Sequence, residues 1–149
     1  MKDSTLLRYF FLSVSLFIIS CKQNSHPNYE RNLENTQKFF NYINENDGLE
    51  KMISMLSPEI KHQSPTYDGK IRNYDERIQE LSGYFSGFKN LKYEAKIWLP
   101  NTDKNGNLTG GVRTYGTWTG EFVETGKNIT LNSFHYYNYD DQGKVINSG

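Results

Sequence analysis

The chain has 149 residues, which is the size of a single domain. Its 17 Lys and Arg residues balance 17 Asp and Glu residues, so it lacks the basic surplus of a nucleic-acid-binding protein, and we expect no nucleic-acid partner. One cysteine excludes a disulfide framework within the chain and a Cys-rich zinc site, and the three histidines form no metal-binding motif. We therefore expect neither a metal nor another cofactor.

Residues 1–20 are predicted to be a lipoprotein signal peptide. Lys2 and Arg8 give a positive start, and the apolar stretch that follows is too short to span a bilayer comfortably. Residues 18–21 read IISC, which resembles a bacterial lipobox, in which the cysteine is lipidated and becomes the new N-terminus. The alternative is an ordinary signal peptide or a membrane anchor that happens to contain a cysteine.

Lipidation at Cys21 would make the protein a lipid-anchored component of a bacterial cell envelope, because more than one acyl chain gives stable anchoring. Lys22 follows the cysteine and no acidic residue does, which by resemblance to proteobacterial sorting suits the outer membrane of a Gram-negative host. Residues 21–32 are polar, contain Pro27 and show no periodicity. We expect this segment to be a tether and the folded domain to span residues 33–149.

The first half of that domain is predicted to be mostly helical. Apolar residues recur at helical spacing over residues 33–43 and 49–56. A third helix is expected to begin at Asn73, which with Glu76 resembles a capping box. Residues 60–71 contain Ser-Pro and Asp-Gly pairs and are expected to form a small hairpin.

After the helices the apolar period changes to two, which predicts antiparallel strands. The expected strands cover residues 91–99, 108–123, 129–140 and 145–146. This pattern predicts an α+β fold. In the first of these strands Trp98 alternates outward, and an exposed Trp suggests a partner surface.

The predicted hairpin of the two long strands fixes which side chains share a face. A two-residue turn at residues 125–126 pairs Trp118 with Ser133 and Gly116 with His135. The apolar face, which should turn toward the helices, then carries Val112, Thr114, Gly116, Trp118, Phe122, Ile129, Leu131, Ser133, His135, Tyr137 and Tyr139. His135 is the single imidazole on this face, and the glycine opposite leaves space beside it.

Residues 112–120 (VRTYGTWTG), 134–139 (FHYYNY) and 143–145 (GKV) resemble the sheet of SnoaL-like domains, which belong to the nuclear transport factor two superfamily. The order of elements agrees over roughly residues 33–146. The resemblance implies a cone-shaped domain with N-terminal helices packed in the concavity of a strongly bent antiparallel sheet, around a pocket. Family chains usually continue the last strand further, so the resemblance implies a domain truncated at its C-terminus.

The superfamily contains isomerases, cyclases, hydrolases and dehydratases, so the fold alone does not define a function. Ketosteroid isomerase uses an Asp base, which lies before a Pro in the hairpin, and an Asp oxyanion donor on a later strand. The matching positions in this sequence are Ser64, before Pro65, and His135. Neither carboxylate is kept, so that mechanism is not expected in its usual form.

We expect a ligand pocket lined by His62, Ser64, Trp118, Tyr137 and His135. His135 is the candidate catalytic residue, as a general base or a ligand-orienting donor, because its ordinary pKa lies near neutrality. The alternative is a structural imidazole bonded to a Tyr or to a backbone carbonyl. Trp118 and Tyr137 either stack on a ligand or belong to the core.

Three functions remain open from the sequence. We favour a membrane-anchored lipoprotein that binds a small, partly apolar molecule. The alternatives are an acid–base enzyme of the isomerase, cyclase or hydrolase type that uses His135, and a structural module that forms a homodimer or binds an envelope partner. A filled concavity would favour the structural module, and two titratable groups in one apolar pocket would favour the enzyme.

Overall fold

The computed structural model describes residues 25–65 and 69–149, so the signal peptide and the lipidation site predicted at Cys21 lie outside the described residues. The helical elements are α2 (Tyr29–Asn41), the 3-10 turn η1 (Tyr42–Asn44), α3 (Gly48–Ser54) and α4 (Tyr74–Gly87). The strands are β1 (Leu56–Gln63), β2 (Ile71–Arg72), β3 (Phe88–Thr102), β4 (Leu108–Phe122), β5 (Asn128–Tyr139) and β6 (Val145–Ser148). Within this part of the chain, no helix is both long and apolar enough to cross a bilayer.

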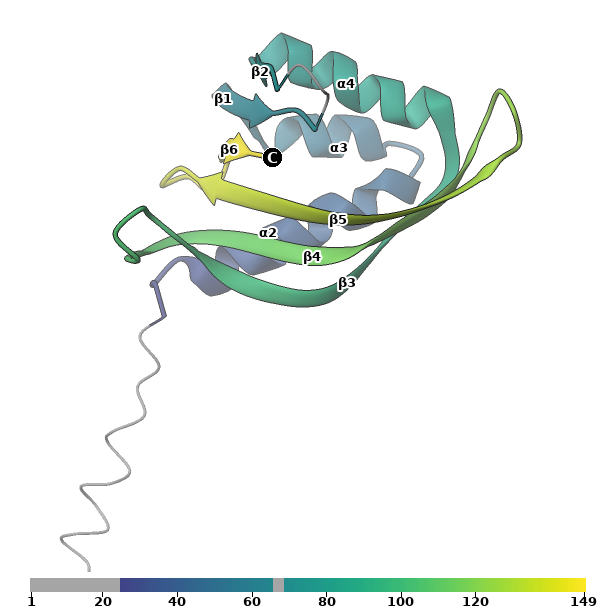
Figure 1. Ribbon diagram of the computed structural model, residues 1–149. Helices are drawn as coiled ribbons and strands as arrows, with labels where there is room; N and C mark the ends of the chain where they lie inside the picture. The colour runs from purple at the N-terminus through teal and green to yellow at the C-terminus, as the bar shows by residue number, and fades with distance from the viewer. Residues whose placement is uncertain (1–24, 66–68) are drawn as a thin grey trace, which may run out of the picture.

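The strands form one curled sheet in the order β2-β1-β6-β5-β4-β3. Figure 1 shows the long strands β3, β4 and β5 bending beneath the helices, which lie on the concave side of the sheet. The expected α+β cone is therefore confirmed. The sheet is mixed rather than purely antiparallel, because β1 and β6 run parallel.

The folded domain begins earlier than expected. α2 starts at Tyr29, so the tether predicted to reach residue 32 is too long by four residues. Asn32 is 2% exposed, and its side-chain amide donates a hydrogen bond of 2.8 Å to the carbonyl of Gly110 in β4. The first helical turn is polar in sequence and Asn32 is its one buried residue, so apolar periodicity could not show where the helix begins.

The predicted start of the third helix and the predicted hairpin are both present. The backbone N–H of Glu76 donates to Oδ1 of Asn73 at 3.1 Å, and the Asn73 N–H donates to Oε2 of Glu76 at 3.0 Å, which confirms the capping box. β1 and β2 pair antiparallel, with His62 opposite Arg72. Together these elements place the inner face of α4 beside β1.

A bulge in β3 reverses the alternation that the sequence suggests. Ala95 pairs with Gly116 and Ile97 pairs with Tyr115, so β3 advances by two residues where β4 advances by one. Lys96 is therefore an extra residue in β3. Ile97 consequently faces outward and is 46% exposed, whereas Trp98 packs against the core. The prediction that Trp98 is exposed and marks a partner surface was therefore wrong.

The pairing of β4 with β5 also differs from the predicted one, but in a way that preserves the faces. Residues 123–127 connect the strands in place of a two-residue turn. Trp118 therefore pairs with Leu131 and Thr114 with His135, two residues from the predicted register. Because side chains alternate with a period of two, a shift of two keeps every residue on its predicted face.

An aromatic cluster joins α2 to the concave face of the sheet. Phe40 is 6% exposed and stacks on Tyr93, with a distance of 4.2 Å between the ring centroids. The Phe40 ring also contacts Trp98, Trp118 and Tyr137 at centroid distances of 5.9, 5.6 and 5.7 Å. This cluster fixes α2 against the sheet and forms one end of the site described next.

Candidate functional site

A cavity of about 230 Å³ lies between the helices and the concave face of the sheet. Most of its wall is apolar and includes Phe39, Phe40, Leu81, Leu91 and Ile129. Three further wall residues, Pro65, Leu131 and Phe134, are exposed, so the cavity opens to solvent beside them. The concavity is therefore hollow, whereas the structural-module hypothesis expected it to be filled.

The structure brings four of the five predicted pocket residues onto this wall: His62, Trp118, Tyr137 and His135. The predicted face is confirmed, because Trp118, Tyr137 and His135 line the same cavity as Ile129 and Leu131. Ser64 is not part of the wall. Its hydroxyl donates a hydrogen bond of 2.7 Å to Oε1 of Glu80 and lies in a polar network behind the cavity.

The imidazole of His135 is held by its neighbours. The indole Nε1–H of Trp118 donates to Nε2 of His135 at 2.9 Å, and Oγ of Ser133 lies 3.1 Å from the same nitrogen. The ring also has a hydrogen bond to the backbone of Gly149. Because Nε2 accepts from Trp118, its lone pair is engaged within the protein and not directed at a ligand.

Burial keeps His135 neutral. It lowers the pKa of His135 to about 4, and the positive charge of Arg77 acts in the same direction. At neutral pH the ring is therefore uncharged and fully hydrogen-bonded. Of the two roles that the sequence left open, this geometry favours the structural one.

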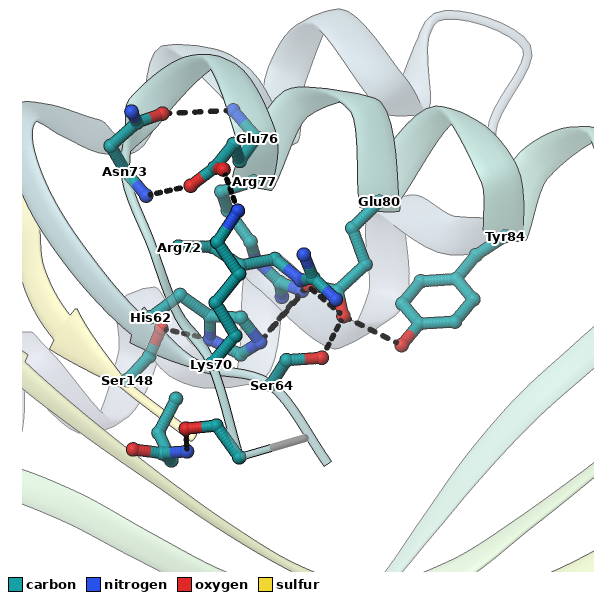
Figure 2. A network of polar contacts seen from close by, with 12 residues as sticks. His62, Ser64, Lys70, Arg72, Asn73, Glu76, Arg77, Glu80, Tyr84 and Ser148 are labelled. Atoms are coloured by element: carbon teal, nitrogen blue, oxygen red, sulfur yellow. Dashed lines mark hydrogen bonds and ion pairs between the residues drawn. The ribbon is translucent and has the colours of Figure 1, made fainter. Parts of the chain in front are cut away.

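A buried polar network lies behind one side of the cavity, between α4, β1 and β6 (Figure 2). Nη1 of Arg77 donates to Oε2 of Glu80 at 2.7 Å. Nε2 of His62 lies 3.1 Å from Oε2 of Glu80 and 3.1 Å from Nη1 of Arg77. Nδ1 of His62 lies 2.9 Å from the hydroxyl of Ser148. Arg77 and His62 are 6% and 5% exposed, so the network is shielded from bulk water.

The network consists of an ionised Arg–Glu pair and a neutral histidine. Burial alone would raise the pKa of Glu80. Hydrogen bonds from His62 and Ser64 and the charge of Arg77 outweigh this effect and bring the pKa well below its usual range. Burial lowers the pKa of His62 and outweighs the opposing hydrogen bond to Glu80. His62 is thus a second neutral imidazole beside the cavity.

The contacts link Ser148, His62 and Glu80 in the order of a serine-nucleophile triad. Ser148 is 1% exposed and does not line the cavity, so a substrate in the cavity cannot reach its hydroxyl. These three residues instead join β6, β1 and α4 to one another. In the described ranges, no group of three His, Cys, Asp or Glu side chains is placed to hold a metal ion.

Sequence analysis did not identify Arg77 and Glu80. α4 turns Tyr74, Arg77, Leu81 and Tyr84 toward the interior, at the spacing of one helical face. The signal available in the sequence was a charged residue, Arg77, between the apolar residues of this helical face. It indicates a buried ion pair or a ligand contact, because Arg is rarely fully buried unless it is paired.

Comparison with known proteins identifies the fold. No protein-family model matches the sequence, and no curated protein is similar to it in sequence. An NTF2-like protein of unknown function from Exiguobacterium sp. 255-15 has a similar structure, with a TM-score of 0.62 at 16% sequence identity over 76% of this chain and 92% of that chain. The chain has the NTF2-like fold. The fold expected from the sequence is thereby confirmed.

Two further solved structures share the fold and are described by their chemistry. SalBIII, an epoxide hydrolase/cyclase-like enzyme with a role in pyran ring formation in the polyether salinomycin, has a TM-score of 0.66 at 12% identity, over 80% of this chain and 88% of its own. RV0760c from Mycobacterium tuberculosis, solved with estradiol-17beta-hemisuccinate, has a TM-score of 0.63 at 12% identity, over 78% of this chain and 88% of its own. At these identities the likeness shows the fold alone.

Proposed function

We propose that this protein binds a small, partly apolar molecule in the cavity of its NTF2-like domain, and that a lipid on Cys21 anchors it in the bacterial cell envelope. The observation that carries the first part is the open cavity of about 230 Å³ with a mostly apolar wall. An apolar cavity of about 150 Å³ is known to bind benzene, so this one has room for a somewhat larger molecule. The estradiol derivative bound to RV0760c supports small-molecule binding in this fold.

An acid–base enzyme that uses His135 is the weaker candidate, although His62 and His135 both line the apolar cavity, as that hypothesis expects. A general base needs a lone pair within reach of the proton that it removes. Nε2 of His135 accepts from Trp118, and both nitrogens of His62 contact protein side chains. Neither imidazole presents a free nitrogen to the cavity, and binding therefore agrees better with the geometry than proton transfer.

The proposed anchor rests on the sequence of residues 1–21. The positive start, the short apolar stretch and the IISC segment agree with a lipoprotein signal. Lys22 favours the outer membrane if the host is Gram-negative. An anchored binding domain would meet its ligand at or near a membrane.

The binding proposal is tested by filling the cavity. Decan-1-ol and decanoate are titrated into the protein, with calorimetry and tryptophan fluorescence as readouts. Ile129→Phe adds volume to the cavity wall and should weaken binding of either probe at least tenfold. Thr130→Phe is the matched control, because Thr130 is the exposed neighbour on the opposite face. Equal binding by both variants, or no binding of either probe to the unaltered protein, would contradict the proposal.

A further inference from the structure

The hydroxyl of Tyr137 is a polar group on the cavity wall that the protein leaves unused. Tyr137 is 4% exposed, and its hydroxyl makes no hydrogen bond to any described residue. Other tyrosines of the core differ: the hydroxyl of Tyr139 bonds to Thr36 at 2.6 Å, and that of Tyr93 bonds to Thr114 at 3.1 Å. Because buried tyrosine hydroxyls normally have a partner, a molecule in the cavity is the natural partner for Tyr137.

Arg77 is a second incompletely used donor on the same wall. Its contacts with described residues run through Nη1, which bonds to Glu80 and touches His62. Its Nε is buried without a hydrogen-bond partner. A molecule in the cavity cannot reach this buried Nε. A guanidinium carries five N–H donors, however, and the contacts of Nη1 with Glu80 and His62 leave those of Nη2 for a ligand.

The positive charge of Arg77 also acts on the interior of the cavity. It lowers the pKa of Tyr137 against the dominant effect of burial, which raises it, and it adds to the lowering of the pKa of His135. Glu80 does not line the cavity, and its carboxylate contacts Ser64, His62 and Arg77. Negative charge is therefore favoured beside Tyr137 and His135, whereas at Tyr84 on the same wall the charge of Glu80 acts more strongly than that of Arg77.

We propose that the ligand is an anionic amphiphile, with an apolar body in the cavity and a carboxylate that accepts hydrogen bonds from Tyr137 and Arg77. This inference rests on the proposed binding function and names its ligand class. A carboxylate is an acceptor with two oxygens, so it can serve both donors at once. A neutral alcohol can pair with Tyr137 but gains little from the charge, and an alkylammonium ion meets a like charge.

The test compares three probes with the same chain at neutral pH: decanoate, decan-1-ol and decylammonium. Decanoate should bind the unaltered protein about tenfold or more tightly than decan-1-ol, since hydrogen bonds to charged groups are the stronger ones. Decylammonium should bind more weakly than both. Tyr137→Phe should weaken decanoate binding about fivefold and leave the fold intact, because the lost hydroxyl bonds to no described residue.

Arg77 requires a paired substitution, because removing it alone leaves Glu80 as an unpaired buried carboxylate. The double variant Arg77→Gln with Glu80→Gln removes both charges, and in it decanoate should lose its advantage over decan-1-ol. If decan-1-ol binds the unaltered protein as tightly as decanoate, or if the double variant keeps the preference, the anionic ligand class is wrong while the binding function stands. If no probe binds, the binding function itself fails.

Discussion

The indole N–H of Trp118 donates a hydrogen bond to Nε2 of His135 across 2.9 Å. The bond links β4 to β5 on the concave face and places the imidazole proton on the other nitrogen, Nδ1. Protonating Nε2 would put two N–H groups against each other and break the bond. The state of His135 is therefore coupled to the stability of the sheet rather than to a reacting molecule.

We expect stability to fall between about pH 6.5 and pH 4. The pKa of His135 is lowered to about 4 in the folded protein, by burial and then by the charge of Arg77, whereas its ordinary value is 6.5. Within this window the unfolded chain binds a proton that the folded chain does not, so lowering the pH destabilises the folded protein by about 3 kcal/mol at most. His62 acts in the same direction. Urea unfolding of the protein across this window measures how steeply the free energy of unfolding depends on pH. His135→Asn should reduce that slope, and an unchanged slope would contradict the assignment.

Tyr139→Phe should destabilise the protein by about 1 kcal/mol, because it removes the 2.6 Å hydrogen bond to the fully buried hydroxyl of Thr36. Tyr137→Phe, two residues earlier on the same strand, should change stability by much less. Thermal unfolding of the two variants provides the comparison. A larger loss in Tyr137→Phe would show that its hydroxyl has a partner within the folded protein.

Phe40→Ala should cost about 3–5 kcal/mol, because Phe40 is at the centre of the aromatic cluster between α2 and the sheet. Phe85→Ala should cost less, because Phe85 is only half-buried at the edge of the core. Denaturant unfolding of both variants tests this order, and equal losses would contradict it.

Gly83→Ala should stabilise the protein by about 0.5–1 kcal/mol. Gly83 lies inside α4, and a Cβ added there meets nothing within 4 Å. The opposite effect is expected for Gly116→Ala, where the Cβ would lie 2.5 Å from the carbonyl of Glu94 and 2.6 Å from the ring of Tyr93. Melting temperatures should move in opposite directions, and a lower value for Gly83→Ala would refute the prediction for α4.

Cys21→Ala should release the protein from membranes or leave its precursor uncleaved. The reason is the IISC segment, in which the cysteine is the acceptor of the lipid. Detergent partitioning and incorporation of labelled palmitate measure the effect. Equal partitioning of both forms, with no label on the unaltered protein, would remove the anchor from the proposal and leave the cavity unaffected.

The faces of the sheet could be predicted from the sequence, but its register and bends could not. Alternation of apolar residues is a local property, and it placed Trp118 and His135 on the concave face correctly. Connections of different lengths between β4 and β5 can keep this alternation. The alternation therefore did not determine that residues 123–127 connect the strands in place of a two-residue turn. The extra residue Lys96 in β3 inverted the prediction for Trp98, and a bulge leaves no periodic signal.

The candidate site was predicted in part. Trp118, Tyr137 and His135 were found because aromatic and imidazole side chains on an apolar face are conspicuous in a sequence, and His62 was found from its place in the predicted hairpin, two residues before Ser64. The pairing of Arg77 with Glu80 was missed, since two charges three residues apart on a helix also describe an ordinary solvated pair. Only the burial of that helical face distinguishes the two cases, and burial depends on tertiary packing.

The early start of α2 limits how far an anchored domain can move. Only residues 22–28 separate Cys21 from Tyr29, and even when fully extended they reach about 25–30 Å. A domain of this length has a radius of gyration of about 14 Å, so the reach is roughly one domain diameter. A protein tethered in this way would sample the water layer next to the bilayer rather than the bulk solution. The concentration of amphiphiles in that layer, not their concentration in the surrounding medium, would then set its occupancy.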